Sequence, residues 1–104
     1  GIANFFNHFC FIGTNSTIGN NNIINTKSLI EHDVKIGNHC HIGPNVKIGG
    51  GSSIGDNVMC GIGTIIINKI NICSNVTLGA GSIVTKNISK PGTYVTAGNK
   101  LRKL

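Results

Sequence analysis

Residues 30–55 read IEHDVKIGNHCHIGPNVKIGGGSSIG, a stretch in which isoleucine occupies every sixth position. The same spacing continues in both directions, and twelve of the thirteen positions between residues 12 and 84 hold Ile, Leu or Val. A fixed short period indicates a repeat architecture, because each unit is too small to bury an apolar face alone. The thirteen positions are Ile12, Ile18, Ile24, Ile30, Ile36, Ile42, Ile48, Ile54, Cys60, Ile66, Ile72, Leu78 and Val84.

Two further features recur with the period. Glycine follows the aliphatic residue in eight repeats, which predicts a tight corner that needs the backbone freedom of glycine. A second compact residue stands two positions earlier, as Val34 and Cys40 do. Residues two apart on a strand share a face, so each hexad predicts a short strand with both ends inward and its middle residue outward.

Stacked coils about 4.8 Å apart can bury a continuous core and pair their backbones. The sequence therefore predicts an all-β solenoid, a parallel β-helix, over residues 1–87. The repeat ends at Pro91-Gly92, so residues 88–104 are expected to form a short C-terminal tail, as a loop, an added strand or a short helix.

The composition narrows the possible partners. The chain has 104 residues, enough for one domain, and a net charge of +6, which favours an anionic ligand. The few aromatic residues are not interleaved with the cations, so a small phosphorylated ligand is favoured and no nucleic acid is expected. No apolar run has the length of a membrane span, and the first residues lack a basic segment followed by an apolar core, so we expect no membrane partner and a cytoplasmic location.

The four cysteines include no Cys-x-x-Cys pair. Cys10, Cys40 and Cys60 fall on repeat positions that require a small or apolar side chain. We therefore expect reduced packing residues rather than a disulfide or metal framework.

The repeat resembles that of the left-handed parallel β-helix, or hexapeptide-repeat, acyltransferases over roughly residues 10–99. Ile30-Glu31-His32-Asp33 and the segment 79–86 are most similar to the NeuD and PglD type, which acetylate sialic acid or UDP-linked amino sugars on oxygen or nitrogen. The resemblance implies a left-handed coil of three hexads, so that residues 18 apart stack. It also implies acetyl-CoA as acyl donor, a sugar or nucleotide-sugar acceptor, and a homotrimer with coenzyme A bound between neighbours.

Two of the three acidic residues, Glu31 and Asp33, flank His32. An imidazole titrates near neutrality, and an adjacent carboxylate can fix its tautomer and raise its basicity, although a solvated corner with incidental charges remains an alternative. The resemblance implies that His32 is the general base and that Asp33 assists it. Stacking by 18 places His32 in a column with Thr14 and Gly50, which leaves room for a ligand.

The resemblance also implies four residues that bind the cofactor. The Gly50 amide faces the thioester carbonyl, where it could stabilise an oxyanion, and His41, Ile62 and Ala80 contact acetyl-CoA. Ile62 and Ala80 share an apolar column with Pro44, and Lys86 with the later basic residues could meet the phosphates. No cysteine adjoins a base in sequence, so direct transfer to a sugar amino or hydroxyl group is expected, without an acyl-enzyme.

The chain departs from the family in two ways. No strand-glycine-helix pattern supplies the N-terminal nucleotide-sugar-binding domain, which we expect to be absent, and Lys100-Leu101 stands where Pro-Ala is usual. The hexads at Asn25, Glu31, Ile67 and Cys73 lack the corner glycine, through simple substitution or a local bulge.

Two other functions remain open. A γ-class carbonic anhydrase would bind zinc through histidines such as His8, His32, His39 and His41, but the expected pair five residues apart is missing and no metal site is predicted. The other is a catalytically silent β-helix scaffold.

Overall fold

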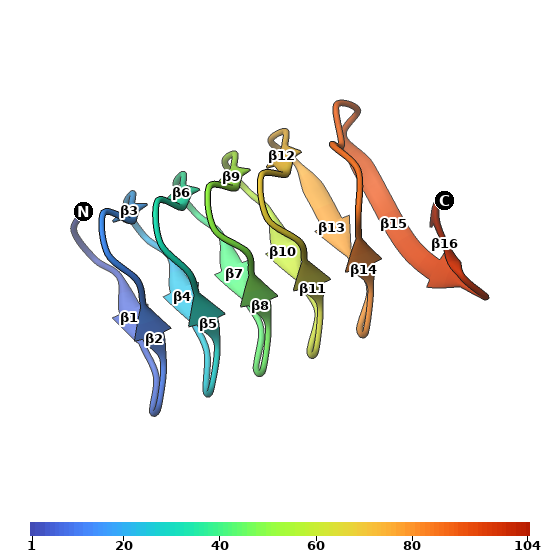
Figure 1. The fold of residues 1–104 in the computed structure, drawn as a ribbon. Coiled ribbons are helices and arrows are strands. Elements are labelled where there is room, and N and C mark those ends of the chain that lie inside the picture. Colours follow the sequence, from blue (N-terminus) through green and yellow to red (C-terminus); the bar gives the residue numbers. More distant parts are fainter.

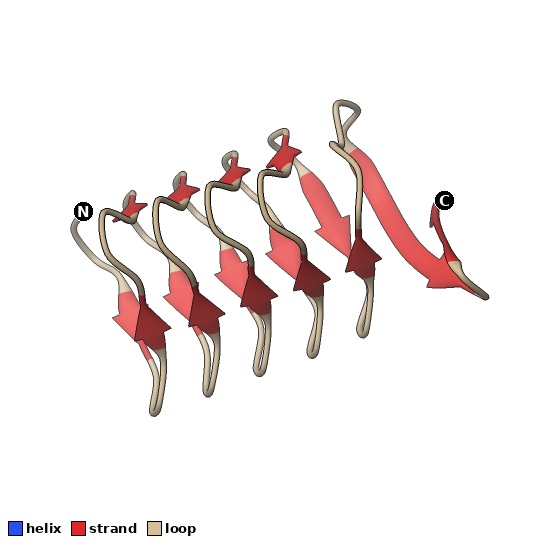
Figure 2. Ribbon diagram, viewed as in Figure 1, coloured by secondary structure: helices blue, strands red, loops and turns tan.

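The chain winds into a slender prism of stacked coils. The computed structural model describes residues 1–104, and every regular element in it is a β-strand (Figures 1 and 2). The prism measures 34 × 22 × 20 Å, with the N-terminus at one end and the last strand at the other (Figure 1). The predicted left-handed parallel β-helix is confirmed. No helix is present that could cross a membrane.

Three sheets, here called A, B and C, form the faces of the prism, and the chain visits them in that order in each coil. Sheet A contains β1 (Phe5–Phe6), β4 (Ile23–Ile24), β7 (His41–Ile42), β10 (Met59–Cys60), β13 (Val76–Leu78), β15 (Gly92–Ala97) and β16 (Lys100–Lys103). Sheet B contains β2 (Phe11–Ile12), β5 (Leu29–Ile30), β8 (Lys47–Ile48), β11 (Ile65–Ile66) and β14 (Ile83–Val84). Sheet C contains β3 (Thr17–Ile18), β6 (Lys35–Ile36), β9 (Ser53–Ile54) and β12 (Asn71–Ile72).

The register repeats every 18 residues from β1 to β14, and it shortens to 16 residues in the last coil, where Ile88 pairs with Ile72. Phe5 pairs with Ile23, and Ile23 pairs with His41, always in parallel. The same offset is kept at three of the hexads without a corner glycine, those of Asn25, Glu31 and Ile67: the Glu31 N–H donates to the Ile48 carbonyl at 3.0 Å. These three are therefore substitutions without a bulge, whereas the Cys73 N–H donates to the Ile88 carbonyl oxygen, two residues earlier than the 18-residue offset requires.

The tail adds strands to sheet A. β15 continues the sheet in parallel with β13, and β16 folds back along β15 as an antiparallel hairpin. Tyr94 pairs with Leu78, an inward residue, and packs against the core beside Leu101. Of the three forms open to the tail, the added strand is the one observed.

The inward residues form the core that the repeat predicts. Eighteen buried apolar residues make one continuous cluster along the prism. Cys40 and Cys60 are both buried in it as free thiols, so their predicted packing role is confirmed. Burial raises the pKa of Cys60 to about 12, and the neighbouring Cys40 adds to this shift.

The corner glycines act differently from the prediction. The left-handed conformation, with φ near +60°, falls two residues after them, at positions such as Asn15, Asn21 and Asn45. The glycines themselves have no positive φ; a Cβ on Gly37 would instead lie 2.8 Å from the Gly55 carbonyl oxygen of the next coil. The expectation that backbone freedom selects these glycines is therefore wrong, because close approach between coils selects them.

Candidate functional site

His32 lies where the chain passes from β5 in sheet B to β6 in sheet C, on what we call the BC edge. Its Nδ1 atom is 2.9 Å from Oδ2 of Asp33, and both side chains are more than half exposed. Asp33 has a φ of 56°, and its N–H donates to the Thr14 carbonyl oxygen of the preceding coil at 2.9 Å. The corner geometry thus places the acid beside the imidazole.

Gly50 lies against the His32 ring in the next coil. A Cβ on Gly50 would sit only 2.6 Å from His32 Nε2, and the Gly51 N–H donates to the His32 carbonyl oxygen at 3.0 Å. The column of Thr14, His32 and Gly50 expected from the 18-residue period is therefore confirmed. The Gly50 N–H has no hydrogen-bond acceptor within the chain. A basic nitrogen and an unused amide donor consequently share one notch at this corner.

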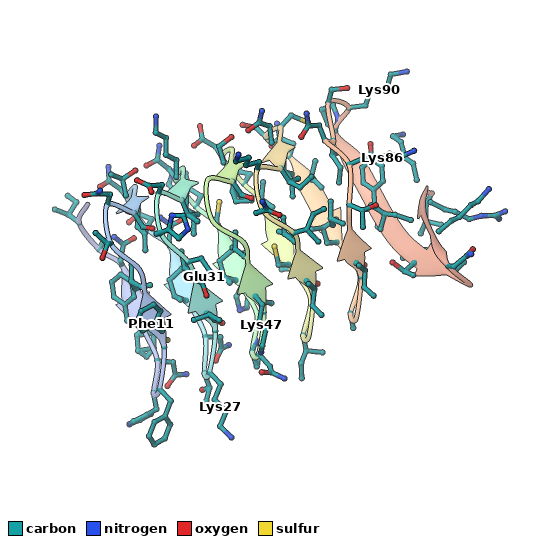
Figure 3. The ribbon with its side chains drawn as sticks, viewed as in Figure 1. Phe11, Lys27, Glu31, Lys47, Lys86 and Lys90 are labelled. Atoms are coloured by element: carbon teal, nitrogen blue, oxygen red, sulfur yellow. The ribbon has the colours of Figure 1, made fainter.

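Glu31 occupies the repeat position that glycine usually holds. Its side chain is half-buried at the end of β5, at the edge where the chain turns toward β6 (Figure 3). It forms no ion pair and no hydrogen bond, since the pair of His32 and Asp33 is the one salt bridge of the chain. Its charge is therefore not neutralised by the protein.

The other predicted cofactor residues form a second group. His41 faces outward in β7 between Ile23 and Met59, and its Nε2 atom is covered and has no hydrogen-bond partner. Ile62 and Ala80 lie on the AB edge, where the chain passes from sheet A to sheet B.

The predicted apolar column on the AB edge is confirmed. The Gly63 N–H donates to the Pro44 carbonyl oxygen at 3.0 Å, and the Gly81 N–H donates to the Ile62 carbonyl oxygen at 2.8 Å. Ile62 is 58% exposed, which is high for an aliphatic residue. This edge therefore presents an apolar surface to whatever lies beside it.

The two groups do not meet within one chain. Sheet B separates the AB edge, with Ile62 and Ala80, from the BC edge, with His32 and Gly50. The four histidines are likewise spread over different edges and faces, and no group of three or more His, Cys, Asp or Glu side chains could hold a metal ion. A site containing both groups needs a second copy of the chain.

A cavity of about 830 Å³ opens at the C-terminal end, between the last coil and the hairpin of β15 and β16. Its lining includes Lys86, Lys90, Lys100 and Tyr94. Figure 3 shows Lys86 and Lys90 at this end, several coils away from Glu31. Lys86 also belongs to the 18-residue series of His32 and Gly50. This cavity was not predictable from the sequence, because its walls depend on the form that the tail takes.

Part of the sequence and the fold are similar to those of known transferases. Residues 15–50 match the family described as bacterial transferase hexapeptide (six repeats). These residues therefore carry the repeat of that family. Comparison of the sequence with curated proteins gives no match.

Solved structures of similar fold include sugar acetyltransferases. A histidine-to-alanine variant of GDP-perosamine N-acetyl transferase from Caulobacter crescentus, in complex with CoA and GDP-perosamine, is 25% identical with a TM-score of 0.86, over 98% of this chain and 51% of that one. The acetyltransferase domain of PglB from Neisseria gonorrhoeae, in complex with acetyl coenzyme A, is 23% identical with a TM-score of 0.87, over 100% of this chain and 53% of that one. A maltose O-acetyltransferase from Clostridium difficile is 27% identical with a TM-score of 0.73, over 97% of this chain and 65% of that one.

The chain spans about half the length of the first two structures. The likeness to the PglB domain supports the fold. The shared region in all three comparisons is the β-helix that carries the BC edge.

Proposed function

We propose that the chain is the β-helix part of an acetyl-CoA-dependent acetyltransferase that modifies an amino or hydroxyl group of a sugar, of the nucleotide-sugar or sialic-acid type. The observation that carries this proposal is the bonded pair of His32 and Asp33 against the bare, unpaired amide of Gly50. Similarity to the perosamine and maltose acetyltransferases supports the reaction class. Four free thiols fit the reducing cytoplasm, where we place the protein.

His32 and Asp33 are assigned the proton transfer. Acetyl-CoA supplies the acetyl group as a thioester whose carbonyl carbon the acceptor attacks. Asp33 holds the Nδ1–H of His32, which leaves Nε2 free to take a proton from the acceptor. The Gly50 N–H donates a hydrogen bond to the carbonyl oxygen as negative charge develops there. His32 then returns the proton to the departing sulfur, so no covalent enzyme intermediate forms.

A homotrimer would join the two groups of residues. The outward residues of sheets A and B are mostly apolar, whereas those of sheet C are polar. Contact between sheet A of one copy and the sheet B side of the next is heterologous, and three copies close it into a ring. We propose that His32, Asp33 and Gly50 of one copy then face His41 of a neighbour, while Ile62 and Ala80 line the groove for the pantetheine arm.

The basic end of the chain fits the phosphates of the donor. Lys86 follows β14 as His32 follows β5, three coils apart, a distance of about 14 Å along the prism at the usual spacing of stacked strands. Lys90 and Lys100 line the same cavity. We assign this cluster to charge-assisted contacts with phosphate oxygens.

The rate of acetyl transfer by the His32→Ala variant tests the proposal. We expect the rate of acetyl transfer, followed by release of the coenzyme A thiol, to fall at least about a hundredfold, the usual worth of a general base. Stabilisation of the folded protein by acetyl-CoA in thermal unfolding should persist, because the variant keeps the binding groove.

His39→Asn is the matched control, since it changes a histidine on a different edge and suits the left-handed φ of 59° there. It should keep the wild-type rate. Full transfer activity in purified His32→Ala protein would contradict the assignment of the base. No stabilisation of the wild-type protein by acetyl-CoA would contradict the proposed donor.

A further inference from the structure

We infer that the acceptor group is a primary amine that arrives as an ammonium ion, and that Glu31 is the residue that selects it over a hydroxyl group. This inference rests on the proposed function and deepens it. It concerns the acidic side chain beside the His32 notch to which the proposed proton transfer gives no role.

The distribution of charge is the first argument. The chain carries nine Lys or Arg residues against three acids, so its surface as a whole repels a cation. Two of the three acids nevertheless flank His32, and the carboxylate of Glu31 has no partner. The nearest cation on the same edge, Lys69, lies over Gly51 and forms no ion pair with either acid. The field at the notch is therefore locally negative in a basic protein.

The position of Glu31 is the second argument. Glycine holds this repeat position in eight hexads, because a Cβ there points into the next coil; a Cβ on Gly13 would lie 2.6 Å from the backbone of Glu31 itself. Above Glu31 the next coil reads Gly49-Gly50-Gly51, three residues without side chains. A half-buried carboxylate thus replaces the structurally favoured residue beside a run of backbone without side chains, and such local conflicts with the fold concentrate at functional sites.

The chemistry distinguishes the two kinds of acceptor. A primary alkylamine is mostly protonated at neutral pH and can pair with Glu31, whereas a hydroxyl group carries no charge for that carboxylate to attract. His32 removes one proton from the ammonium, and the neutral nitrogen forms the C–N bond as the C–S bond breaks. One proton leaves on the sulfur and one goes to water, so that ammonium and thioester give amide, thiol and a proton.

Two acceptors that differ at one atom provide the test: a nucleotide sugar with an amino group and the same sugar with a hydroxyl group at that carbon. With acetyl-CoA and the wild-type protein, we expect kcat/KM for the amine to exceed that for the alcohol by at least about tenfold, the worth of one hydrogen bond to a charged group. Added NaCl should lower transfer to the amine, because salt screens the attraction.

Glu31→Gln should lower the ratio of amine to alcohol transfer about tenfold, mainly by raising KM for the amine, and should weaken the salt dependence. Glu31→Gly restores the residue of the other hexads, so it keeps the fold and should give the same result. Thermal unfolding of both variants verifies folding. A preference of the wild type for the alcohol, or an equal loss for both acceptors in the two variants, overturns the inference. Absence of transfer to either acceptor overturns the proposed function as well.

Discussion

Gly37 directly follows an inward isoleucine and Gly50 stands one position later in its hexad, and the structure requires the two glycines for different reasons. At Gly37 an added Cβ would meet a backbone carbonyl oxygen of the next coil. At Gly50 it would meet the tip of the His32 side chain, which is more than half exposed and can move away. One glycine therefore protects the stacking of the coils, and the other protects the position of the imidazole.

We predict that Gly50→Ala keeps the fold and loses activity. The displaced imidazole should lower the rate of acetyl transfer by about a hundredfold, as misplacement by one ångström can, while the melting temperature changes by only a few degrees. Gly37→Ala should show the reverse pattern, with a clear drop in melting temperature. Circular dichroism melts and the thiol-release assay on both variants measure the two effects. Equal melting temperatures for the two variants would refute the distinction.

Cys60 makes stability sensitive to high pH. Its pKa is raised from the ordinary 9.0 to about 12 by burial, so the fold favours the neutral thiol. The stabilisation is complete below pH 9 and is lost as the pH rises from there toward 12, by at most about 1.4 kcal/mol per pH unit. We expect urea unfolding between pH 8.5 and 11 to show a steeper loss for the wild type than for Cys60→Val. Identical pH profiles would argue against this cause.

At the scale of the element, side chains join the coils along the CA edge, where the chain passes from sheet C to sheet A. The Asn20 N–H donates to Asn38 Oδ1, the Asn38 N–H to Asp56 Oδ1 and the Asp56 N–H to Ser74 Oγ, each at 2.8 Å. The amides at this edge thus find their acceptors in the side chains of the following coil. This ladder of hydrogen bonds joins the corners of successive coils, which lie outside the paired strands.

We predict that Asn38→Ala destabilises the fold by about 1 kcal/mol, because the Asn20 N–H loses its acceptor at a partly exposed site. Asp56→Asn should cost much less, since an amide oxygen can replace the carboxylate oxygen. Urea unfolding at neutral pH gives both values. The ladder would have no energetic role if the two substitutions cost the same.

The hexad period was sufficient to predict a β-solenoid, and the 18-residue offset that the family resemblance implies was sufficient to predict which residues share a column with His32. The same arithmetic placed Ile62 and Ala80 beside Pro44 correctly. The tail was not predictable in this way, since pairing of Tyr94 with Leu78 follows no repeat. The separation of the His32 group from the Ile62 group was not predictable either, because a site that contains both groups depends on contacts between copies of the chain. The roles of His32, Asp33, Gly50, His41, Ile62 and Ala80 remain predictions.

At the scale of the whole molecule, the two ends of the prism are unlike. Residues 1–26 contain no Lys, Arg, Asp or Glu, and all four phenylalanines occur within residues 5–11. Phe6 and Ile12 hold inward positions, yet they remain exposed because no coil lies below them. At the other end, the hairpin and Tyr94 cover much of the core. The core is therefore closed more fully at its C-terminal end.

We predict that backbone protection follows this asymmetry. Amides of β1 to β3 should exchange with deuterium fastest, because they have a neighbouring coil on only one side and can open locally. Amides of β7 to β9, with coils on both sides, should exchange slowest. Exchange followed by mass spectrometry resolves these segments. Uniform protection along the chain would mean that the prism opens as a single unit.

Because the coils stack at a constant spacing, the distance between two residues of one column is a whole number of coil spacings. His32 and the cationic end at Lys86 are separated by three whole coils, and duplication of one coil would lengthen that distance by about 4.8 Å while every column stayed in line. An insertion of 17 or 19 residues would instead exchange inward and outward side chains in all later strands. The distance between the His32 corner and the basic end can therefore change only by whole coils. A ligand of intermediate length must adapt its own conformation to the protein.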